Sequence, residues 1–309
     1  MTSGAFGTGP IVRLASTGRI RYRHDMERWL VRAARVLGAF IGTFAGVVAV
    51  QFMRLRRMEF LPMHPGFYVN HVVDPTGPRA EDRPLRLVVL GDSTTAGVGV
   101  GRAEDALPYR LAQHIADRER RPVHVVSYGW AGARVADLPA TQLPRALEPL
   151  RAGETAPFLP GADIVALVIG SNDATHHTRH GRYRADLRRT LEIVRESAPQ
   201  ARVVLAGIPA FRGALKAIEP LISLADMYAR ILRPISRSEA ARAGAAYADL
   251  ARHVPPRIDR TTEFLSSDRF HPSAVGYAIW ADVIFEALLD GPASQNPPPT
   301  AAPMEPAGA

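Results

Sequence analysis

The chain has 309 residues, a length that predicts one large domain or a medium-sized domain with appendages. It contains no cysteine, which excludes disulfide bonds, thiol catalysis and cysteine-ligated metal sites. The net charge is +8, but residues 1–60, with ten arginines against three acidic residues, account for seven of these charges. A nucleic-acid-binding domain carries its basic patch on the folded body, so we expect no nucleic acid partner.

Residues 1–35 form a basic arm that precedes an uncharged apolar run at 36–53. These 18 residues are just enough to cross a bilayer as a helix, so the run is a candidate transmembrane anchor. The alternative is a buried helix of a soluble domain, whereas a cleaved signal peptide fits poorly because no Ala-x-Ala-like site follows the run. Gly38, Gly42 and Gly46 share one helix face, which would allow two such helices to pair as a homodimer.

The arginines beside the apolar run predict its orientation. Six lie between positions 19 and 35, and only Arg54, Arg56 and Arg57 follow the run directly. The flank with more arginines is favoured on the cytoplasmic side. We therefore expect a membrane-anchored protein whose N-terminus stays inside and whose main domain is extracytoplasmic.

The rest of the chain divides by composition into a linker, a domain and a tail. Residues 54–84 contain five prolines, which exclude helix interiors and central strands, so we interpret this segment as a Pro-rich linker. Residues 291–309 are rich in proline and alanine with few large apolar residues, and we expect a disordered tail. The domain occupies the intervening residues 85–290.

Strand-like apolar runs alternate with helical patterns in this domain. The apolar runs lie at 85–90, 123–127, 163–169, 202–208 and 245–248, and the helical patterns at 106–120, 134–150, 182–197, 223–243 and 273–289. A nearly continuous apolar run indicates a strand buried on both faces, as in parallel sheets. We therefore expect an α/β fold, a three-layer α/β/α sandwich with a parallel central sheet, plus an N-terminal apolar helix.

Ser93 follows the first apolar run in the sequence Gly91-Asp92-Ser93. It is predicted at the carboxyl end of a core strand, the edge where open α/β sheets place their ligands. A serine hydroxyl needs a base, an orienting carboxylate and oxyanion donors to act as a nucleophile. This stretch alone fits equally well a turn that caps a helix. A phosphate-binding loop at 97–101 would lack both the P-loop ending and the G-x-G-x-x-G spacing.

Three further segments are predicted at the same edge of the sheet. They are Gly129 with Gly132 after the second strand, Gly170-Ser171-Asn172-Asp173 after the third, and Asp268-Arg269-Phe270-His271-Pro272 before the last helix. Each has an ordinary structural explanation when taken singly: a turn glycine, an Asx turn or a helix cap.

Together, Gly-Asp-Ser, a glycine, Gly-x-Asn-Asp and Asp-x-x-His-Pro resemble the sequence blocks of the SGNH (GDSL-type) hydrolase family. The resemblance covers the whole predicted domain and implies a flavodoxin-like α/β/α fold with a Ser-His-Asp triad and no metal or cofactor. Matched position by position, Ser93 is the nucleophile, His271 the general base and Asp268 its orienting acid. Gly132 and Asn172, with the backbone N–H of Ser93, correspond to the oxyanion hole.

The chemistry of these residues agrees with those roles. A histidine can take the serine proton near neutral pH and return it to a leaving alcohol. Asp268 precedes His271 by three positions, so both can face one pocket from a single turn. We expect an esterase, lipase or deacetylase that acts through an acyl-enzyme on a small-molecule, lipid or carbohydrate ester. The alternatives are an acyltransferase with the same triad and a membrane-tethered binding protein without catalysis.

Other residues of the domain carry further expectations. His176, His177 and His180 could bind zinc, but no nearby carboxylate or histidine completes a site, so we expect no metal and interpret them as a cleft rim or a solvated loop. Asp92 and Asp173 are expected to fix turns through backbone N–H groups.

Two features of the domain stay open. The side chain of Trp130 could line a pocket for the acyl group of the substrate, or it could belong to the hydrophobic core. Residues 211–237 exceed the length of an ordinary strand-to-helix connection, and their apolar stripe favours a helix packed on the body over a flap that covers the site.

Overall fold

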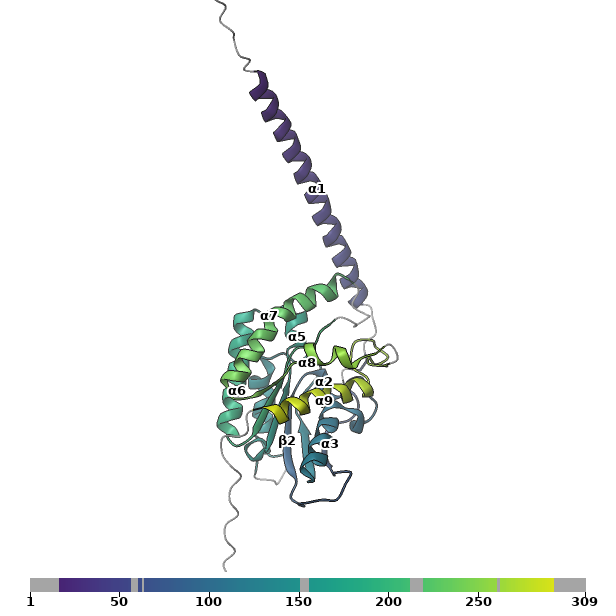
Figure 1. The fold of residues 1–309 in the computed structure, drawn as a ribbon, viewed down its shortest axis with the longest axis vertical. Coiled ribbons are helices and arrows are strands. Elements are labelled where there is room, and N and C mark those ends of the chain that lie inside the picture. Colours follow the sequence, from purple (N-terminus) through teal and green to yellow (C-terminus); the bar gives the residue numbers. More distant parts are fainter. Residues whose placement is uncertain are drawn as a thin grey trace, which may run out of the picture. The chain divides into compact units, whose positions relative to one another are not determined.

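The computed structural model describes residues 17–56, 61–62, 64–150, 156–211, 219–259 and 262–291. The chain divides into two compact units, residues 1–56 and 57–309. The first contains helix α1 (Thr17–Arg56), and the second is an α/β domain (Figure 1). The predicted tail falls on residues 291–309, of which all but Gly291 lie outside the described residues.

Helix α1 extends well beyond the predicted apolar run at 36–53. It also includes residues 17–35 of the predicted basic arm, and the start of that arm lies outside the described residues. The part from Met26 to Arg54 is long and apolar enough to cross a membrane, and none of its most apolar window is buried. This exposure does not fit the alternative of a buried core helix. By length and composition, α1 is suited to be a membrane anchor or a signal sequence.

Gly38, Gly42 and Gly46 leave one face of α1 open. A Cβ placed at any of them would meet no atom within 4 Å. Small residues on an open face permit close helix association in a bilayer. Pairing of two chains through these glycines stays a prediction.

The α/β domain is built on a six-stranded sheet in the order β1-β3-β2-β4-β5-β6. The strands are β1 (Asn70–Val73), β2 (Leu85–Gly91), β3 (Val123–Ser127), β4 (Ile164–Val168), β5 (Arg202–Ala206) and β6 (Ala246–Ala248). Strands β2 to β6 are parallel, as predicted, whereas β1 runs antiparallel to β3. The parallel part has the flavodoxin-like order, in which ligands bind where the strand order reverses, here between β2 and β4.

Strand β1 differs from the expectation that residues 54–84 form only a linker. It pairs with β3, with Asn70 opposite Val126, and the side chains of Val69 and Val73 are buried in the domain core. The strand has four residues and begins with Asn-His, so it presents no apolar run in the sequence. The prolines of this segment flank the strand rather than interrupt it, which is compatible with an edge position.

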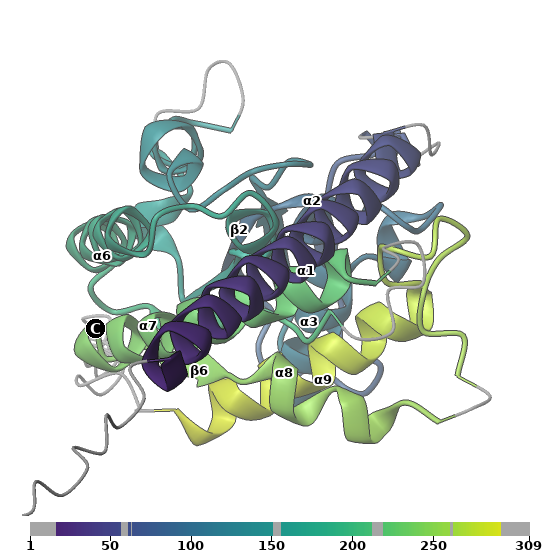
Figure 2. The ribbon, with the colours of Figure 1, turned by 90° about the horizontal axis from the view of Figure 1, so that it is seen from above.

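Helices cover both faces of the sheet. On one face lie α3 (Leu107–Glu119), α8 (Leu250–His253) and α9 (Ala274–Asp290), and on the other η2 (Leu138–Gln142), α4 (Leu143–Ala146), α6 (His180–Ser197) and α7 (Leu221–Arg242). Figure 2 shows β2 between α6 and the pair α3 and α9. The short elements are α2 (Ser93–Ala96), η1 (Ala103–Asp105), η3 (Leu159–Gly161), α5 (Ser171–Thr175) and η4 (Pro255–Arg257).

The side chains of β2 explain why its sequence is apolar without alternation. Val88 and Leu90 pack among the residues of α6 and α7, whereas Leu87 and Val89 pack against α3 and α9. All four are at most 1% exposed. Both faces of the strand are therefore core, which is the pattern expected of a central strand in a three-layer fold.

The helical pattern predicted at 134–150 forms a shorter helical stretch at 138–146, in which the π-helical η2 passes directly into α4. Gln142 and Leu143, at the junction, both have right-handed helical dihedral angles. Pro139 lies in the first turn, and Pro144 follows the π-helical turn. Proline lacks the N–H that a regular α-helix interior requires, which is compatible with a change of helix type before Pro144.

Candidate active site

Strand β2 ends in a sharp change of direction that presents Ser93. A Cβ at Gly91 would collide with the carbonyl oxygen of Val168, so this position requires glycine. Asp92 caps α2, because its Oδ1 accepts hydrogen bonds from the backbone N of Thr94 (3.0 Å) and from its Oγ1 (2.8 Å). Burial raises the pKa of the Asp92 carboxyl. The predicted turn-fixing role of Asp92 is confirmed, and Ser93 becomes the first residue of α2.

Gln142 holds the end of β2 in place, and the sequence did not indicate this role. Its Oε1 accepts from the backbone N of Gly91 (2.9 Å), and its Nε2 donates to the carbonyl oxygen of Gly91 (2.7 Å). The side chain is fully buried. The side-chain amide of Gln142 thus forms hydrogen bonds with both the N–H and the carbonyl oxygen of Gly91, two residues before Ser93.

His271 lies between Ser93 and Asp268. Its Nε2 is 3.0 Å from Ser93 Oγ, and its Nδ1 is 2.7 Å from Asp268 Oδ2. All three residues are buried, with exposed fractions of 8% for Ser93, 6% for His271 and 3% for Asp268. The structure therefore brings together the three residues that the sequence blocks assigned to a triad.

Asp268 also organises the turn that carries His271. Its Oδ1 accepts from Ser266 Oγ (2.8 Å) and from the backbone N of Phe270 (2.8 Å) and of His271 (2.9 Å), which leaves Oδ2 for the imidazole. Burial alone would raise the pKa of Asp268, but hydrogen bonds from the His271 ring and these other donors hold the pKa below its ordinary value. Asp268 is therefore a charged acceptor that fixes both the loop and the ring of His271.

Gly99 has a structural role beside the same loop. Its φ is +112°, and a Cβ there would collide with the carbonyl oxygen of Pro272 and press on Cβ of His271. Glycine adopts this backbone region without the strain that other residues carry. The glycine permits the loop after α2 to approach the base closely.

Asn172 and Gly132 lie on neighbouring segments of the carboxyl edge. Asn172, in the first turn of α5, donates from Nδ2 to the carbonyl oxygen of Ala133 (2.9 Å), the residue after Gly132. Asp173 accepts from the backbone N of Val135 (2.9 Å), so its predicted turn-fixing role is confirmed. Gly132 itself has φ +84°, a left-handed conformation that favours glycine. The ends of β3 and β4 are thereby tied together.

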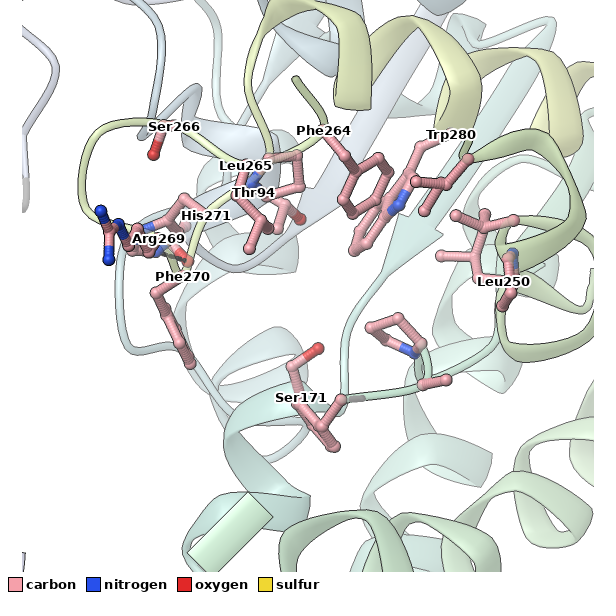
Figure 3. A pocket seen from close by; sticks show the side chains of 18 of the residues that line it. Thr94, Ser171, Leu250, Phe264, Leu265, Ser266, Arg269, Phe270, His271 and Trp280 are labelled. Carbon is pink, nitrogen blue, oxygen red and sulfur yellow. Dashed lines mark hydrogen bonds between the residues drawn. The ribbon is translucent and has the colours of Figure 1, made fainter. Parts of the chain in front are cut away.

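A cavity of about 1000 Å³ opens on the three polar groups Ser93, Asn172 and His271. Figure 3 shows Arg269 and Phe270 at one end of this cavity and Leu250 and Trp280 at the other. The walls toward Trp280 are mainly apolar, with contributions from Leu250, Val254, Ile258 and Phe264. A ligand in this cavity can place a polar group at Ser93 and an apolar group against these walls.

Gly132 and Trp130 are absent from the described residues that line this cavity. Trp130 is half-buried and packs against the core cluster on the side of α6 and α7, which favours the core interpretation. Gly132 can reach the site only through its backbone N–H.

The family of the chain follows from its sequence match. Residues 89–279, more than half of the chain, match the model of the GDSL-like lipase/acylhydrolase family. The chain belongs to this family. The family predicted from the four sequence blocks is thus confirmed.

A curated member of the GDSL family is similar over most of the domain. A GDSL-like esterase of Mycobacterium tuberculosis is 28% identical over 211 residues, which cover 67% of this chain and 62% of that protein. The match thus spans less than two thirds of the relative.

Solved structures of two lipases share the fold. An extracellular lipase from Streptomyces rimosus superposes with a TM-score of 0.50 at 23% identity, covering 67% of this chain and all of the lipase. A lipase from a goat rumen metagenome gives a TM-score of 0.52 at 20% identity, covering 66% of this chain and 97% of that chain. At these identities the likeness concerns the fold, and the predicted α/β/α class is confirmed.

The histidines at 176, 177 and 180 lie on the surface of this GDSL-family domain. His176 Nδ1 is 2.9 Å from the carbonyl oxygen of Asn172, and the ring of His177 packs near Tyr228. Among the described residues, no group of three or more His, Asp or Glu side chains is arranged to hold a metal ion. Exposed positions at the end of α5 and the start of α6 fit a solvated loop.

Helix α7 resolves part of the question about residues 211–237. Its buried face, with Ile222, Ala229, Leu232 and Ile235, packs into the core cluster, so most of the segment is a helix on the body of the domain. Residues 212–218, which precede it, lie outside the described residues.

Proposed function

We propose that this chain is a serine ester hydrolase in which Ser93 is the nucleophile, His271 the general base and Asp268 its orienting acid. The observation that carries the proposal is the continuous series of hydrogen-bond contacts from Asp268 through His271 to Ser93. A serine is activated when a base accepts its proton, and a carboxylate on the far ring nitrogen holds the base in the required tautomer.

In the acylation half of the reaction, Ser93 Oγ attacks the ester carbonyl carbon while His271 Nε2 accepts the hydroxyl proton. The carbonyl oxygen becomes an oxyanion in the tetrahedral intermediate. The intermediate collapses as the ester C–O bond breaks, and His271 returns the proton to the departing alcohol. In deacylation, water loses a proton to His271 and attacks the acyl carbon, and the carboxylic acid leaves as Ser93 regains its proton.

The oxyanion would be bound by the backbone N–H groups of Ser93 and Gly132 and by the side-chain amide of Asn172. One amide hydrogen of Asn172 is engaged by the carbonyl oxygen of Ala133, which orients the amide and leaves the second hydrogen to donate. Within the described part of the chain, neither the N–H of Ser93 nor that of Gly132 has a backbone acceptor. Preorganised donors of this kind lower the barrier most where charge develops.

The test compares two serines that line the same cavity. Ser93→Ala should abolish hydrolysis of a p-nitrophenyl ester, whereas Ser171→Ala, the matched control, should retain most of it. Equal activity of the two variants would contradict the role of Ser93. An acyl product that appears only when an added alcohol is present would indicate the acyltransferase alternative.

We also propose that α1 anchors the protein in a membrane, with the α/β domain on the extracytoplasmic side. The apolar part of α1 and the excess of arginines before it support this topology. The full chain should sediment with membranes, resist carbonate extraction and expose its α/β domain to protease added from outside. A full chain released by carbonate would contradict the anchor, and a protected domain would contradict the orientation.

A further inference from the structure

The chain that follows α1 joins the α/β domain at the edge that carries the catalytic residues. Strand β1 is antiparallel, so its first residue, Asn70, pairs near the carboxyl end of β3, and the carbonyl oxygen of Val69 accepts from Ser127 N (2.9 Å). Phe67 lies directly against Gly97, in the turn that follows the helix of Ser93. The chain thus reaches the domain at the end of α2, the short helix that begins with Ser93.

The tether between α1 and this point is short. Residues 57–66 separate Arg56, the last residue of α1, from Phe67. Ten residues span at most about 35 Å when fully extended. The tether therefore attaches to the domain at the carboxyl edge of the sheet.

Exposed apolar side chains are concentrated at the same edge. In the described part of the α/β domain, seven large hydrophobic side chains are exposed: Tyr68, Val72, Leu147, Met227, Ile231, Val275 and Leu289. Four of them, which we call the apolar rim, lie at the carboxyl edge: Tyr68 (74% exposed), Met227 (58%), Ile231 (48%) and Val275 (48%).

The apolar rim is made of residues from three separate parts of the domain. Tyr68 precedes β1 at one end of the sheet, and Val275 is the second residue of α9, just after the loop of His271. Met227 and Ile231 lie in the first half of α7, and Arg233 of the same helix donates to the carbonyl oxygens of Ile208 and of Pro209, which lines the cavity. Apolar side chains gathered at a functional edge are typical of surfaces that meet a protein or a membrane.

We infer that this edge docks on the surface of a lipid bilayer, with the apolar rim in contact with lipid, and that the substrate is an ester drawn from that bilayer. The inference rests on the proposed function, in which α1 is a membrane anchor and Ser93 attacks an ester. The cavity opens at the docked edge and has mainly apolar walls, so an acyl chain can pass from lipid to protein without crossing water. Burial of apolar surface provides the free energy for such docking.

The position of the domain can be measured without any activity assay. Because the chain has no cysteine, Met227→Cys and Leu289→Cys each carry a polarity-sensitive fluorophore at one site only. Leu289 is the matched control, since it is exposed (42%) but lies at the end of α9, away from the rim. The full chain is reconstituted in phosphatidylcholine vesicles with and without spin-labelled lipid. Strong quenching at position 227 and weak quenching at position 289 is the expected result, and equal quenching at both positions would overturn the docking.

The source of the substrate is tested with a second pair of variants. The double variant Met227→Ser/Ile231→Ser should hydrolyse a fluorogenic lipid ester embedded in vesicles about tenfold more slowly than the wild type. This factor corresponds to a roughly tenfold weaker affinity of the domain for the bilayer surface. Hydrolysis of a water-soluble short-chain ester should be unchanged, and Leu289→Ser should change neither rate. An equal effect on both substrates, or none on the lipid ester, would overturn the inference. If the wild-type chain cleaves neither ester, the proposed function fails, while the quenching result still decides the docking.

Discussion

The Nε2 atom of His271 lies 3.0 Å from Oγ of Ser93, although 178 positions separate the two residues in the chain. The contact exists because Ser93 follows a central strand and His271 sits on a loop pinned at the same edge, where the backbone N of Ser266 donates to the His271 carbonyl oxygen (2.9 Å). The end of β2 and the loop pinned at Ser266 therefore together set the distance between Ser93 Oγ and His271 Nε2.

Replacing Asp268 by Asn should lower kcat by about four orders of magnitude, because the wrong imidazole tautomer is then favoured. The amide can still accept the backbone hydrogen bonds of the loop, so we expect a folded protein. Activity is measured with a water-soluble ester and folding by circular dichroism. A native spectrum with more than a tenth of wild-type activity would show that His271 does not need this carboxylate.

Loss of the Asn172 side chain should reduce kcat by about 10²–10³ with little change in KM, since an oxyanion donor acts mainly in the transition state. Steady-state kinetics of Asn172→Ala provide the measurement. If only KM rises, Asn172 binds the ground state and does not belong to the oxyanion hole.

Activity should fall as the pH is lowered, because only a neutral imidazole can accept the serine proton. The pKa of Asp268 is held below its ordinary value of about 3.9 by its hydrogen bonds, so this carboxylate stays charged above that value and continues to accept from His271. A pH–rate profile with and without EDTA checks this. Inactivation by EDTA that zinc reverses would instead give His176, His177 and His180 a metal-binding role.

Gln142→Met should destabilise the domain by roughly 2–6 kcal/mol, because leaving each of two buried polar groups without a partner costs about 1–3 kcal/mol. The two groups affected are the backbone N–H and carbonyl of Gly91. Denaturant unfolding of the variant and the wild type measures the difference. A change below about 0.5 kcal/mol, the range of neutral surface substitutions, would mean that water replaces the amide.

The parallel strands were predictable because each depends on local sequence, and the meeting of Ser93, Asp268 and His271 at one edge was predictable because their sequence blocks resemble those of the SGNH family. A core strand needs a continuous apolar run, and each block of the site lies at the end of a strand or the start of a helix. Strand β1 was missed because an edge strand of four residues, half of them polar, is held by pairing with β3 and not by its own pattern.

Gln142 was missed for a related reason. A single glutamine within an apolar helical pattern gives no sign that its amide bonds to a backbone 51 residues earlier. Contacts of this kind depend on the tertiary arrangement of η2 and β2. They become visible only in the structure, as do the contact of Phe67 with Gly97 and the gathering of exposed apolar side chains at one edge.

The central claim, that Ser93 is an activated nucleophile, is tested most directly by covalent labelling. The full chain is treated with a fluorophosphonate, digested and analysed by mass spectrometry, with Ser93→Ala and Ser171→Ala as companion variants. We predict one phosphonyl adduct per chain on the peptide that contains Ser93, retained in Ser171→Ala and lost in Ser93→Ala. An adduct on another serine, or none in an otherwise folded protein, would contradict the account.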